Sequence, residues 1–407
     1  MCRAAAVAAG AVSGQRKTAL SIRPAGPMMT AITLPQALSF RLDRQHLTNP
    51  AADALVAART LIGAQAQVHS AAILQLRARS AAGAADGDID RALYHDRSLV
   101  KLWAQRSTLH LMPSDDLPMI LGLRREYVAG YHNWYAKEGL SLDQVDTLVA
   151  AVVQALEQGA HSRMDLSRRL VPELGEWARP MLEHSWGGII KLACALGHVC
   201  HGPAEKADGE GAREALFVHL AQWLGRVLVV PDARTAMADL ARRYLAVYGP
   251  ATPADFKKFV GFYAGPAQQA FADLGGEIVP VTLGAKKAYV LERDLADLMA
   301  AEPVERQISV LGLFDPYLLA HVDTGQYLED RFRPAVYRVA GWISPVILRQ
   351  GRVVATWTHK TVAGPKGKGA WAVQVTPLER VYKKELPAIT RGLKRLSGGV
   401  PVEVTGV

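Results

Sequence analysis

The ten residues from Leu61 to Ser70 constrain this chain more than any other stretch of its sequence. Apolar residues before it recur at helix-face spacing and predict a helix near residues 51–62. Gly63 suits the left-handed conformation that ends many helices. A second predicted helix covers residues 70–80, with Ser70 as its cap. The link between the two helices is therefore short and non-helical.

Gln65 and Gln67 lie two residues apart in that link. Residues at this spacing share one side of an extended backbone, whereas in a helix they point in nearly opposite directions. Their two amide groups could then hold a water molecule at a fixed place and angle. The pattern alone leaves a second interpretation open, because glutamines in turns usually contact solvent or cap backbone groups.

The stretch resembles the Q-x-Q signature of the AlkZ family of DNA glycosylases, which remove bulky alkylpurine adducts and unhook DNA crosslinks. In the related YcaQ branch, Asp replaces the second Gln. The resemblance extends from about Leu34 to the C-terminus, and the following segments match the family in order: Trp103–Leu111, Tyr248–Phe256, Phe314–Leu319 and Gly341–Val346. The chain is therefore identified as a member of the Q-x-Q branch.

This resemblance implies an α+β fold of three tandem winged-helix units in a C-shaped body that takes DNA in its concave face. Residues 1–33 are expected to be a tail, either disordered or translated from an upstream start. The winged-helix units are predicted over residues 34–125, which hold the Q-x-Q motif, and then over 126–232 and 233–308. A C-terminal β-rich region with a hairpin and a terminal helix follows over 309–407.

The composition excludes several classes of protein. Half of the 407 residues are hydrophobic, yet no apolar run is long enough to span a bilayer, so no membrane partner is expected. Three cysteines make no disulfide framework and fit a reducing cytoplasm. We expect a cytoplasmic, nucleoid-associated monomer whose partner is double-stranded DNA carrying alkylpurine lesions or crosslinks.

The net charge of +9 is concentrated near the C-terminus, where His359–Val400 holds nine Lys or Arg residues against two Glu. A basic region of this kind is a plausible footprint for nucleic acid, although it could also be a solvated face. A basic, Gly-rich loop is predicted over residues 358–368. It contributes Lys360, Lys366 and Lys368 as candidate DNA ligands.

Further candidate DNA ligands lie near the motif and in the second unit. A strand is predicted from Lys101 to Met112, in which Arg106, Thr108 and His110 would share one face and contact phosphates. The alternative is that this face is the polar side of a half-buried strand. His69, beside the Q-x-Q motif, and Arg163 and Arg168, near a helix predicted over 162–171, complete the set.

Three other patterns have a structural interpretation. Cys194, His198, Cys200 and His201 imitate a zinc site, but no second ligand pair follows, so neither a metal ion nor any other cofactor is expected. Asp315 is expected to start a turn that Pro316 stiffens. An aromatic group at helical spacing is more typical of packing than of a platform for bases; its members are Tyr127, Tyr131, Trp134 and Tyr135.

The chemistry implied by the resemblance can work without a charged side chain. Cleavage of a nucleoside C–N bond passes through a cationic sugar. A purine alkylated at N7 or N3 is already positively charged and leaves without protonation, so placing the water becomes the main task. The hypothesis is that Gln67 holds the attacking water, while Gln65 orients that water or the sugar.

The motif contains no lysine that could form a Schiff base, so a monofunctional glycosylase that leaves an abasic site is expected. The alternative is a non-catalytic winged-helix DNA-binding protein, either a transcriptional regulator or a lesion binder. The sequence leaves open which lesion is preferred, and whether the role is general DNA repair or self-resistance to a genotoxin.

Overall fold

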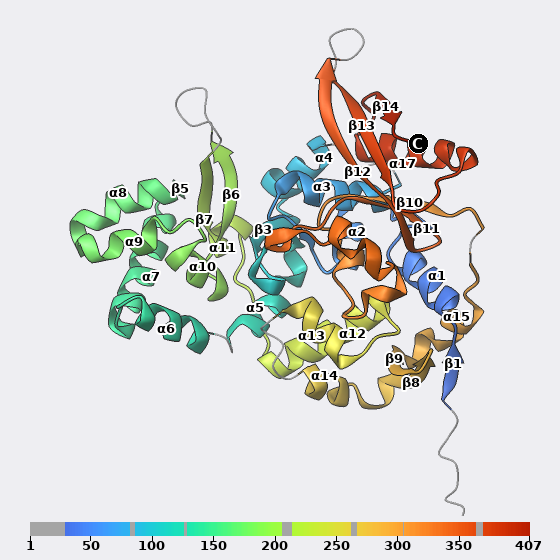
Figure 1. Cartoon of the computed structure of the whole chain (residues 1–407). Coiled ribbons are helices and arrows are strands. Elements are labelled where there is room, and N and C mark those ends of the chain that lie inside the picture. The colour runs from blue at the N-terminus through green and yellow to red at the C-terminus, as the bar shows by residue number, and fades with distance from the viewer. Residues whose placement is uncertain are drawn as a thin grey trace, which may run out of the picture.

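A computed structural model describes residues 29–81, 86–125, 128–205, 214–261, 267–303, 305–363 and 369–407. Its strands form three sheets, ordered β1-β8-β9, β2-β4-β3-β6-β7-β5 and β10-β11-β12-β13-β14. Figure 1 shows α6 to α10 gathered in a lobe beside a larger body that holds most of the other elements. The α+β class expected from the sequence is confirmed.

The two glutamines lie between two helices, as predicted. The bounds are Ala54–Thr60 for α2, Ala64–Gln65 for β2 and His69–Arg79 for α3. Gly63 has a φ of 92°, as its predicted role requires. The predicted cap Ser70 is wrong, because α3 already begins at His69 after Val68, which makes no side-chain capping bond.

The strand predicted from Lys101 to Met112 is also wrong, because a hairpin replaces it. β3 (Leu99–Trp103) and β4 (Leu109–Pro113) pair antiparallel around a turn in which Arg106 and Ser107 have φ values of 53° and 57°. No Gly, Pro, Asn or Asp marks this turn in the sequence, so its usual signal is missing. Arg106 therefore lies in the turn and not on a strand face.

The second segment of the chain extends the sheet that contains the glutamines. β3 pairs with β6 at Lys101 and His201, which joins two of the predicted units in one sheet. Ser141 and Ser162 cap α7 and α8. The sequence predicts the first of these helices near residues 141–158, opened by Ser141. The bounds are Asp86–Asp90 (α4), Leu117–Arg125 (α5), Val128–Lys137 (α6), Leu142–Glu157 (α7), His161–Ser162 (β5), Arg163–Leu174 (α8), Arg179–Leu182 (α9), Gly188–Ala195 (α10), Val199–Glu205 (β6), Glu214–His219 (β7) and Leu220–Leu224 (α11).

The third segment builds the smallest sheet. Thr252 caps α13 and Pro253 opens it, which is the helix start that Thr followed by Pro predicts from the sequence. Part of the predicted tail belongs here, because β1 pairs parallel with β8; the tail expected over residues 1–33 therefore ends before Thr30, and residues 1–28 lie outside the described part. The bounds are Thr30–Ile32 (β1), Leu34–Arg44 (α1), Ala233–Tyr248 (α12), Pro253–Val260 (α13), Ala267–Asp273 (α14), Ile278–Leu283 (β8), Lys286–Leu291 (β9) and Leu295–Ala300 (α15).

The C-terminal segment is β-rich, as predicted, and its hairpin turns at Gln350 and Gly351, whose φ values are 49° and 80°. Residues 358–363, predicted as loop, instead continue β12, because β13 pairs with them up to Ala363. The amphipathic pattern predicts the terminal helix over residues 378–396, but the helix begins only at Leu386. The bounds are Ile308–Leu311 (β10), Arg333–Val336 (α16), Val346–Arg349 (β11), Arg352–Ala363 (β12), Gly369–Pro377 (β13), Leu386–Leu396 (α17) and Val402–Thr405 (β14).

One order of elements recurs three times along the chain. A helix is followed by a short extended segment, two further helices and an antiparallel hairpin, and in the second set the four-residue α9 also lies between the two further helices. The sets are α2, β2, α3, α4, β3–β4; then α7, β5, α8, α10, β6–β7; then α12, α13, α14, β8–β9, in which a bridge between Ala251 and Tyr289 takes the place of the short strand. The repeat places β2, with its glutamine, at the edge of the first hairpin.

Buried contacts connect these segments. Arg79 of α3 and Asp315 form an ion pair whose two side chains are fully buried, and Asp315 also accepts a hydrogen bond from the backbone of Tyr317, as its turn role predicts.

Of the aromatic group, Tyr135 is buried and Trp134 packs on His184, whereas Tyr127 lies outside the described residues. Within the described part of the chain, no helix is long and apolar enough to cross a bilayer.

Candidate active site

Gln65 is held by its backbone in the short strand β2. Its N–H donates to Oε1 of Gln75 over 3.0 Å, and Nε2 of Gln75 donates back to its carbonyl oxygen over 3.1 Å. On the other side, β2 pairs with β4, with Gln65 opposite His110. These contacts fix the extended backbone that leads to Gln67.

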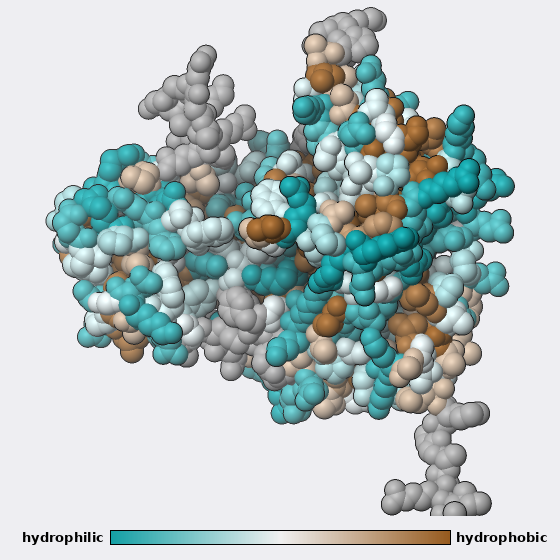
Figure 2. Space-filling model, in the orientation of Figure 1, coloured by the Kyte–Doolittle hydropathy of each residue, from teal (hydrophilic) through white to brown (hydrophobic). Residues whose placement is uncertain are grey.

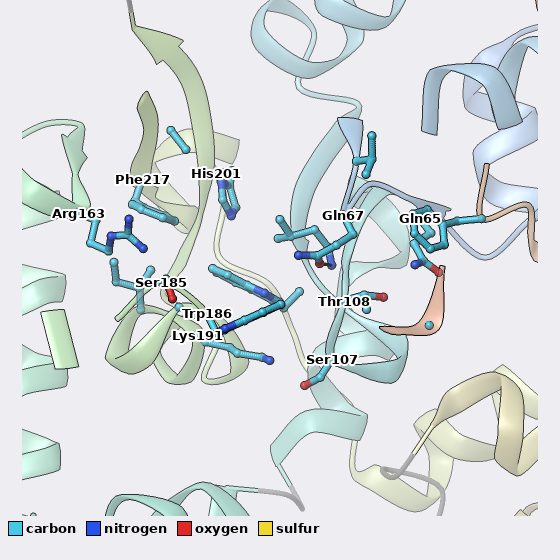
Figure 3. A pocket seen from close by; sticks show the side chains of 18 of the residues that line it. Gln65, Gln67, Ser107, Thr108, Arg163, Ser185, Trp186, Lys191, His201 and Phe217 are labelled. Carbon is cyan, nitrogen blue, oxygen red and sulfur yellow. Dashed lines mark hydrogen bonds between the residues drawn. The ribbon is translucent and has the colours of Figure 1, made fainter. Parts of the chain in front are cut away.

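Gln65 and Gln67 line one cavity of about 660 Å³, hereafter the glutamine cavity. Figure 3 shows both on one side of it, with Arg163, Trp186, His201 and Phe217 on the other. Among the described residues that line it, none is Asp or Glu; they are Gln65, Gln67, Val68, Trp103, Ser107, Thr108, Leu109, Arg163, Ser185, Trp186, Gly187, Ile190, Lys191, His201, Ala215, Phe217, Phe314, Ala340, Gly341 and Trp342.

The two glutamine side chains differ in their surroundings. Gln65 is 6% exposed, and its Oε1 accepts a hydrogen bond from Nη2 of Arg106 over 2.9 Å. Gln67 is exposed, and its Oε1 accepts a longer bond, of 3.3 Å, from the backbone N–H of Leu109. The Gln65 amide is therefore held by a charged donor, whereas the Gln67 amide stands at the open side of the cavity.

Arg106 is part of this internal network. Its other terminal nitrogen donates to the carbonyl of Phe259 in α13. Gly261 must be glycine here, because a Cβ at that position would stand 2.7 Å from Cα of Arg106. Burial lowers the pKa of Arg106 to about 10, which leaves it charged at neutral pH. Helix α13, in the third predicted unit, thus supports Gln65 in the first predicted unit through Arg106.

His110 is neutral and buried beside Arg106. Its Nδ1 lies 2.9 Å from the carbonyl of Thr108 and donates to it, so Nε2 is left to accept from Arg106 over 3.4 Å. Burial, and then the charge of Arg106, lower the pKa of His110 to about 3. At 2% exposure His110 does not reach the surface, where a DNA phosphate would lie.

A family comparison agrees with this geometry. The model of the AlkZ-like DNA glycosylase family matches residues 58–398, which include both glutamines and every described residue that lines the cavity. This chain belongs to the AlkZ-like DNA glycosylase family. An interstrand DNA cross-link repair glycosylase of Streptomyces sahachiroi is 32% identical over 331 residues, which cover 79% of this chain and 86% of that protein.

Among solved structures, the Streptomyces sahachiroi DNA glycosylase AlkZ is similar to this AlkZ-like chain. Its TM-score is 0.78 at 28% sequence identity, and the match covers 92% of this chain and 100% of that one. The likeness therefore extends over the lobe and the body together and is not confined to the Q-x-Q segment.

The other predicted DNA ligands of this AlkZ-like protein are dispersed. Thr108 and Arg163 line the glutamine cavity, where Arg163 also donates to the carbonyl of His184 over 3.1 Å. His69 is half-buried at the start of α3. Arg168 is exposed on α8, outside the cavity, and pairs with Asp165. Lys360 is exposed on β12, whereas Lys366 and Lys368 lie outside the described residues.

Lys191 is a cavity residue that the sequence reasoning missed. It comes from α10, faces the cavity with Trp186, and has its pKa lowered to about 8 by burial and then by the charge of Arg124. One signal could have found it, because Lys191 is the single charged residue in the otherwise apolar stretch Gly188–Ala195. A lysine there must either be buried at a cost or face a polar space.

The zinc-like pattern is divided between two buried clusters. Cys194 packs with the α7 and α8 side chains, and Cys200 packs with those of α5 and α12. Burial raises the pKa of the Cys194 thiol to about 12, so it stays protonated. His201 instead packs between Trp103 and Phe217 at the wall of the glutamine cavity, where burial lowers its pKa to about 3.

Proposed function

We propose that this chain is a monofunctional glycosylase that hydrolyses the N-glycosidic bond of bulky N7- or N3-alkylpurine adducts, or of interstrand crosslinks, and leaves an abasic site. One observation carries the proposal: the two glutamines share a cavity whose described lining holds no carboxylate. The Streptomyces sahachiroi relative is an interstrand DNA cross-link repair glycosylase, which supports the same substrate class.

A cavity without a carboxylate suits a leaving group that needs no proton. The alkylated purine carries its positive charge into the site and departs as a neutral base. The oxocarbenium ion that remains reacts with a water that is correctly placed, and deprotonation contributes little. Gln67, at the open side, holds this water, and Gln65, fixed by Arg106, orients the water or the sugar.

We further propose that the threefold repeat of elements corresponds to three winged-helix units around a C-shaped, DNA-binding concavity. The order of helix, short strand, two helices and hairpin is that of a winged helix. The lobe and the body flank the glutamine cavity, which draws its lining from both. The enzyme acts as a monomer in the cytoplasm, in association with the nucleoid.

Phosphates on the DNA would meet the cationic side of the glutamine cavity. Arg163 and Lys191 supply this side, and Thr108 adds a hydroxyl. Lys360 and Arg168 lie further out and would contact flanking phosphates, with His69 near the motif. The buried His110 is not included, because its contacts are internal. Binding of this kind weakens steeply with salt.

The test uses duplex DNA with N7-methylguanine and measures strand breaks after alkali. We expect breaks with the native protein and at least about 100-fold fewer with Gln67→Ala or Gln65→Ala. Gln268→Ala, which changes an exposed glutamine on α14, is the matched control and should keep full activity. A transcriptional regulator would give no breaks and would prefer one undamaged sequence, and a lesion binder would retain methylated DNA without cutting it.

A further inference from the structure

One aliphatic side chain at the rim of the glutamine cavity lies almost wholly in solvent. Val339 is 91% exposed, the highest value among the large hydrophobic residues of the described structure. The next three residues, Ala340, Gly341 and Trp342, line the cavity, whereas Val339 does not. Its side chain therefore projects from the rim into solvent. The face drawn in Figure 2 is mostly hydrophilic, with apolar residues only in small patches, so few apolar groups are left in water in this way.

A closed loop, residues Arg338–Trp342, presents Val339 and is hereafter called the rim loop. The N–H of Arg338 donates to the carbonyl oxygen of Trp342 over 2.7 Å. Immediately outside the loop, Tyr337 and Ile343 form an antiparallel bridge. These backbone contacts close the base of the rim loop and fix the direction in which its tip points.

The rim loop is also anchored to the body of the protein. The hydroxyl of Tyr337 donates to the carbonyl oxygen of Leu318 over 2.6 Å, and the ring of Trp342 packs on Phe314 with centroids 5.2 Å apart. Ala340, at the tip, has a φ of 57°, which is unfavourable for a residue with a side chain. Strained backbone of this kind concentrates at ligand sites. A rigid loop also loses little conformational entropy when it binds.

The surroundings of the rim loop indicate DNA as its partner. Arg338, next to Val339, is exposed. Arg163 and Lys191 line the same cavity from the lobe. Figure 1 shows the orange segment that leads into β11 reaching from the body toward that lobe. A duplex whose phosphates meet these cations therefore brings its bases against the tip of the rim loop.

The size of the exposed group indicates how it contacts DNA. One valine is too small to form a protein interface, which buries about 800 Å² on each partner. A single apolar side chain on a rigid support is instead what DNA-bending proteins insert between two base pairs, where it unstacks one step. The exposed guanidinium beside it suits the neighbouring phosphate.

We propose that Val339 is a wedge that enters the base stack next to the lesion, while Arg338 contacts the adjacent phosphate. This inference rests on the proposed function and adds to it the way in which the site reaches a nucleotide inside a duplex. Stacked neighbours hold the sugar of an alkylated purine in the regular helix. Opening one step lets that sugar approach the water at Gln67, and burial of the valine between bases offsets part of the cost of unstacking.

The first experiment measures unstacking directly. The duplex carries N7-methylguanine with a 2′-fluorine, which slows hydrolysis because it destabilises the cationic sugar, and 2-aminopurine as the neighbouring base. The fluorescence of 2-aminopurine rises when the base loses its stacking partner. Native protein and Val339→Leu should raise it, and Val339→Ala should lose most of the rise. Val229→Ala is the matched control, because Val229 is 89% exposed but lies outside the cavity.

The second experiment measures cleavage of N7-methylguanine in two duplexes with ordinary sugars, one fully paired and one with a mismatch beside the lesion. Val339→Ala should lower kcat/KM about 10-fold on the paired duplex. The loss should be less than about 3-fold beside the mismatch, because that step is already weakly stacked. Equal losses on the two duplexes, or no loss on either, would contradict a wedge.

Salt dependence separates the wedge from the phosphate contact. Arg338→Gln should reduce the slope of log affinity against log salt by about 1, because it removes one phosphate contact. Val339→Ala should leave that slope unchanged, because an apolar side chain releases no counterion. A reduced slope for the valine variant would show that its loss of activity comes from weaker phosphate contacts, which overturns the inference.

Failure of the proposed function would be distinguishable from failure of the wedge. The first would appear as a native protein that gives no strand breaks yet still raises the 2-aminopurine fluorescence in a manner that depends on Val339. The second would appear as no rise with the native protein, or as equal rises with the native protein and Val339→Ala, and either result overturns the inference even if the DNA is cut.

Discussion

Arg106 donates a hydrogen bond from Nη2 to Oε1 of Gln65 over 2.9 Å, while its other nitrogen donates to the carbonyl of Phe259. The bond to Gln65 occupies one lone pair of the amide oxygen and fixes which end of the amide is oxygen. The cationic donor also makes this bond stronger than a neutral one. Arg106 is therefore a positioning residue that acts through Gln65.

Replacing this arginine should lower the chemical rate more than the affinity for DNA. In Arg106→Gly, the φ of 53° is accommodated by glycine, and we expect kcat to fall about 100-fold with KM changed by less than about 3-fold. Added guanidinium ion should restore part of kcat. Arg97→Gly, at another residue with a φ of 53°, is the control for the backbone. A rise in KM at unchanged kcat would assign Arg106 to DNA binding instead.

The rate of the chemical step should be nearly independent of pH between about 6 and 8. Gln65 and Gln67 do not titrate, and the two buried histidines at the site, His110 and His201, have pKa values near 3. Both histidines are therefore neutral across this range. Single-turnover rates with saturating enzyme on N7-methylguanine DNA measure the step directly, and a single-proton slope in this range would contradict the assignment of the glutamines.

Gln67→Asp provides the positive control for that measurement. An aspartate can still hold a water, so the variant should retain more activity than Gln67→Ala. Its rate should fall as acid protonates the new carboxylate toward about pH 4. The rate of the native protein should show no such single-proton dependence.

Lys191 should make DNA binding, unlike the chemical step, sensitive to alkaline pH. Its pKa of about 8 lies below the ordinary 10.5, so the ammonium is lost as the pH rises through about 8 and affinity for DNA should weaken there. Lys191→Met should remove this dependence and reduce the slope of log affinity against log salt by about 1. Lys137→Met, at an exposed lysine outside the cavity, should keep the pH dependence.

The lowered pKa of Lys191 also affects folding stability. Stability should increase as the pH rises, whereas affinity for DNA should decrease. Between about pH 8 and 10.5 the unfolded chain binds a proton at Lys191 that the folded chain does not, so this residue makes folding more favourable as the pH rises. Below about pH 8 the full cost of burying the charge is present. Lys191→Met should therefore raise Tm at pH 7, and the gain should disappear toward pH 10.5; a lowered Tm at pH 7 would argue against the burial.

The sequence predicted local features well, because their causes are local. Thr252 with Pro253 marks a helix start, and Gln350-Gly351 marks a hairpin turn, since cap and turn chemistry is carried by the residues themselves. The turn at Arg106 was missed, because contacts with α13, far away in the sequence, hold it. Trp186 and Trp342 line one cavity because separate segments pack together around it, and no local pattern encodes that packing.

The ion pair between Arg79 and Asp315 should be a main determinant of stability, because it connects α3, next to the glutamines, to the C-terminal segment. Both side chains are fully buried, and two nitrogens of Arg79 each lie 2.8 Å from one carboxylate oxygen. Asp315→Ala leaves a buried cation without its partner and should lower the free energy of unfolding by about 3–5 kcal/mol in urea. Arg91→Ala breaks the exposed pair with Asp96 and should cost less than about 1 kcal/mol. Similar costs for the two variants would mean that water reaches Arg79.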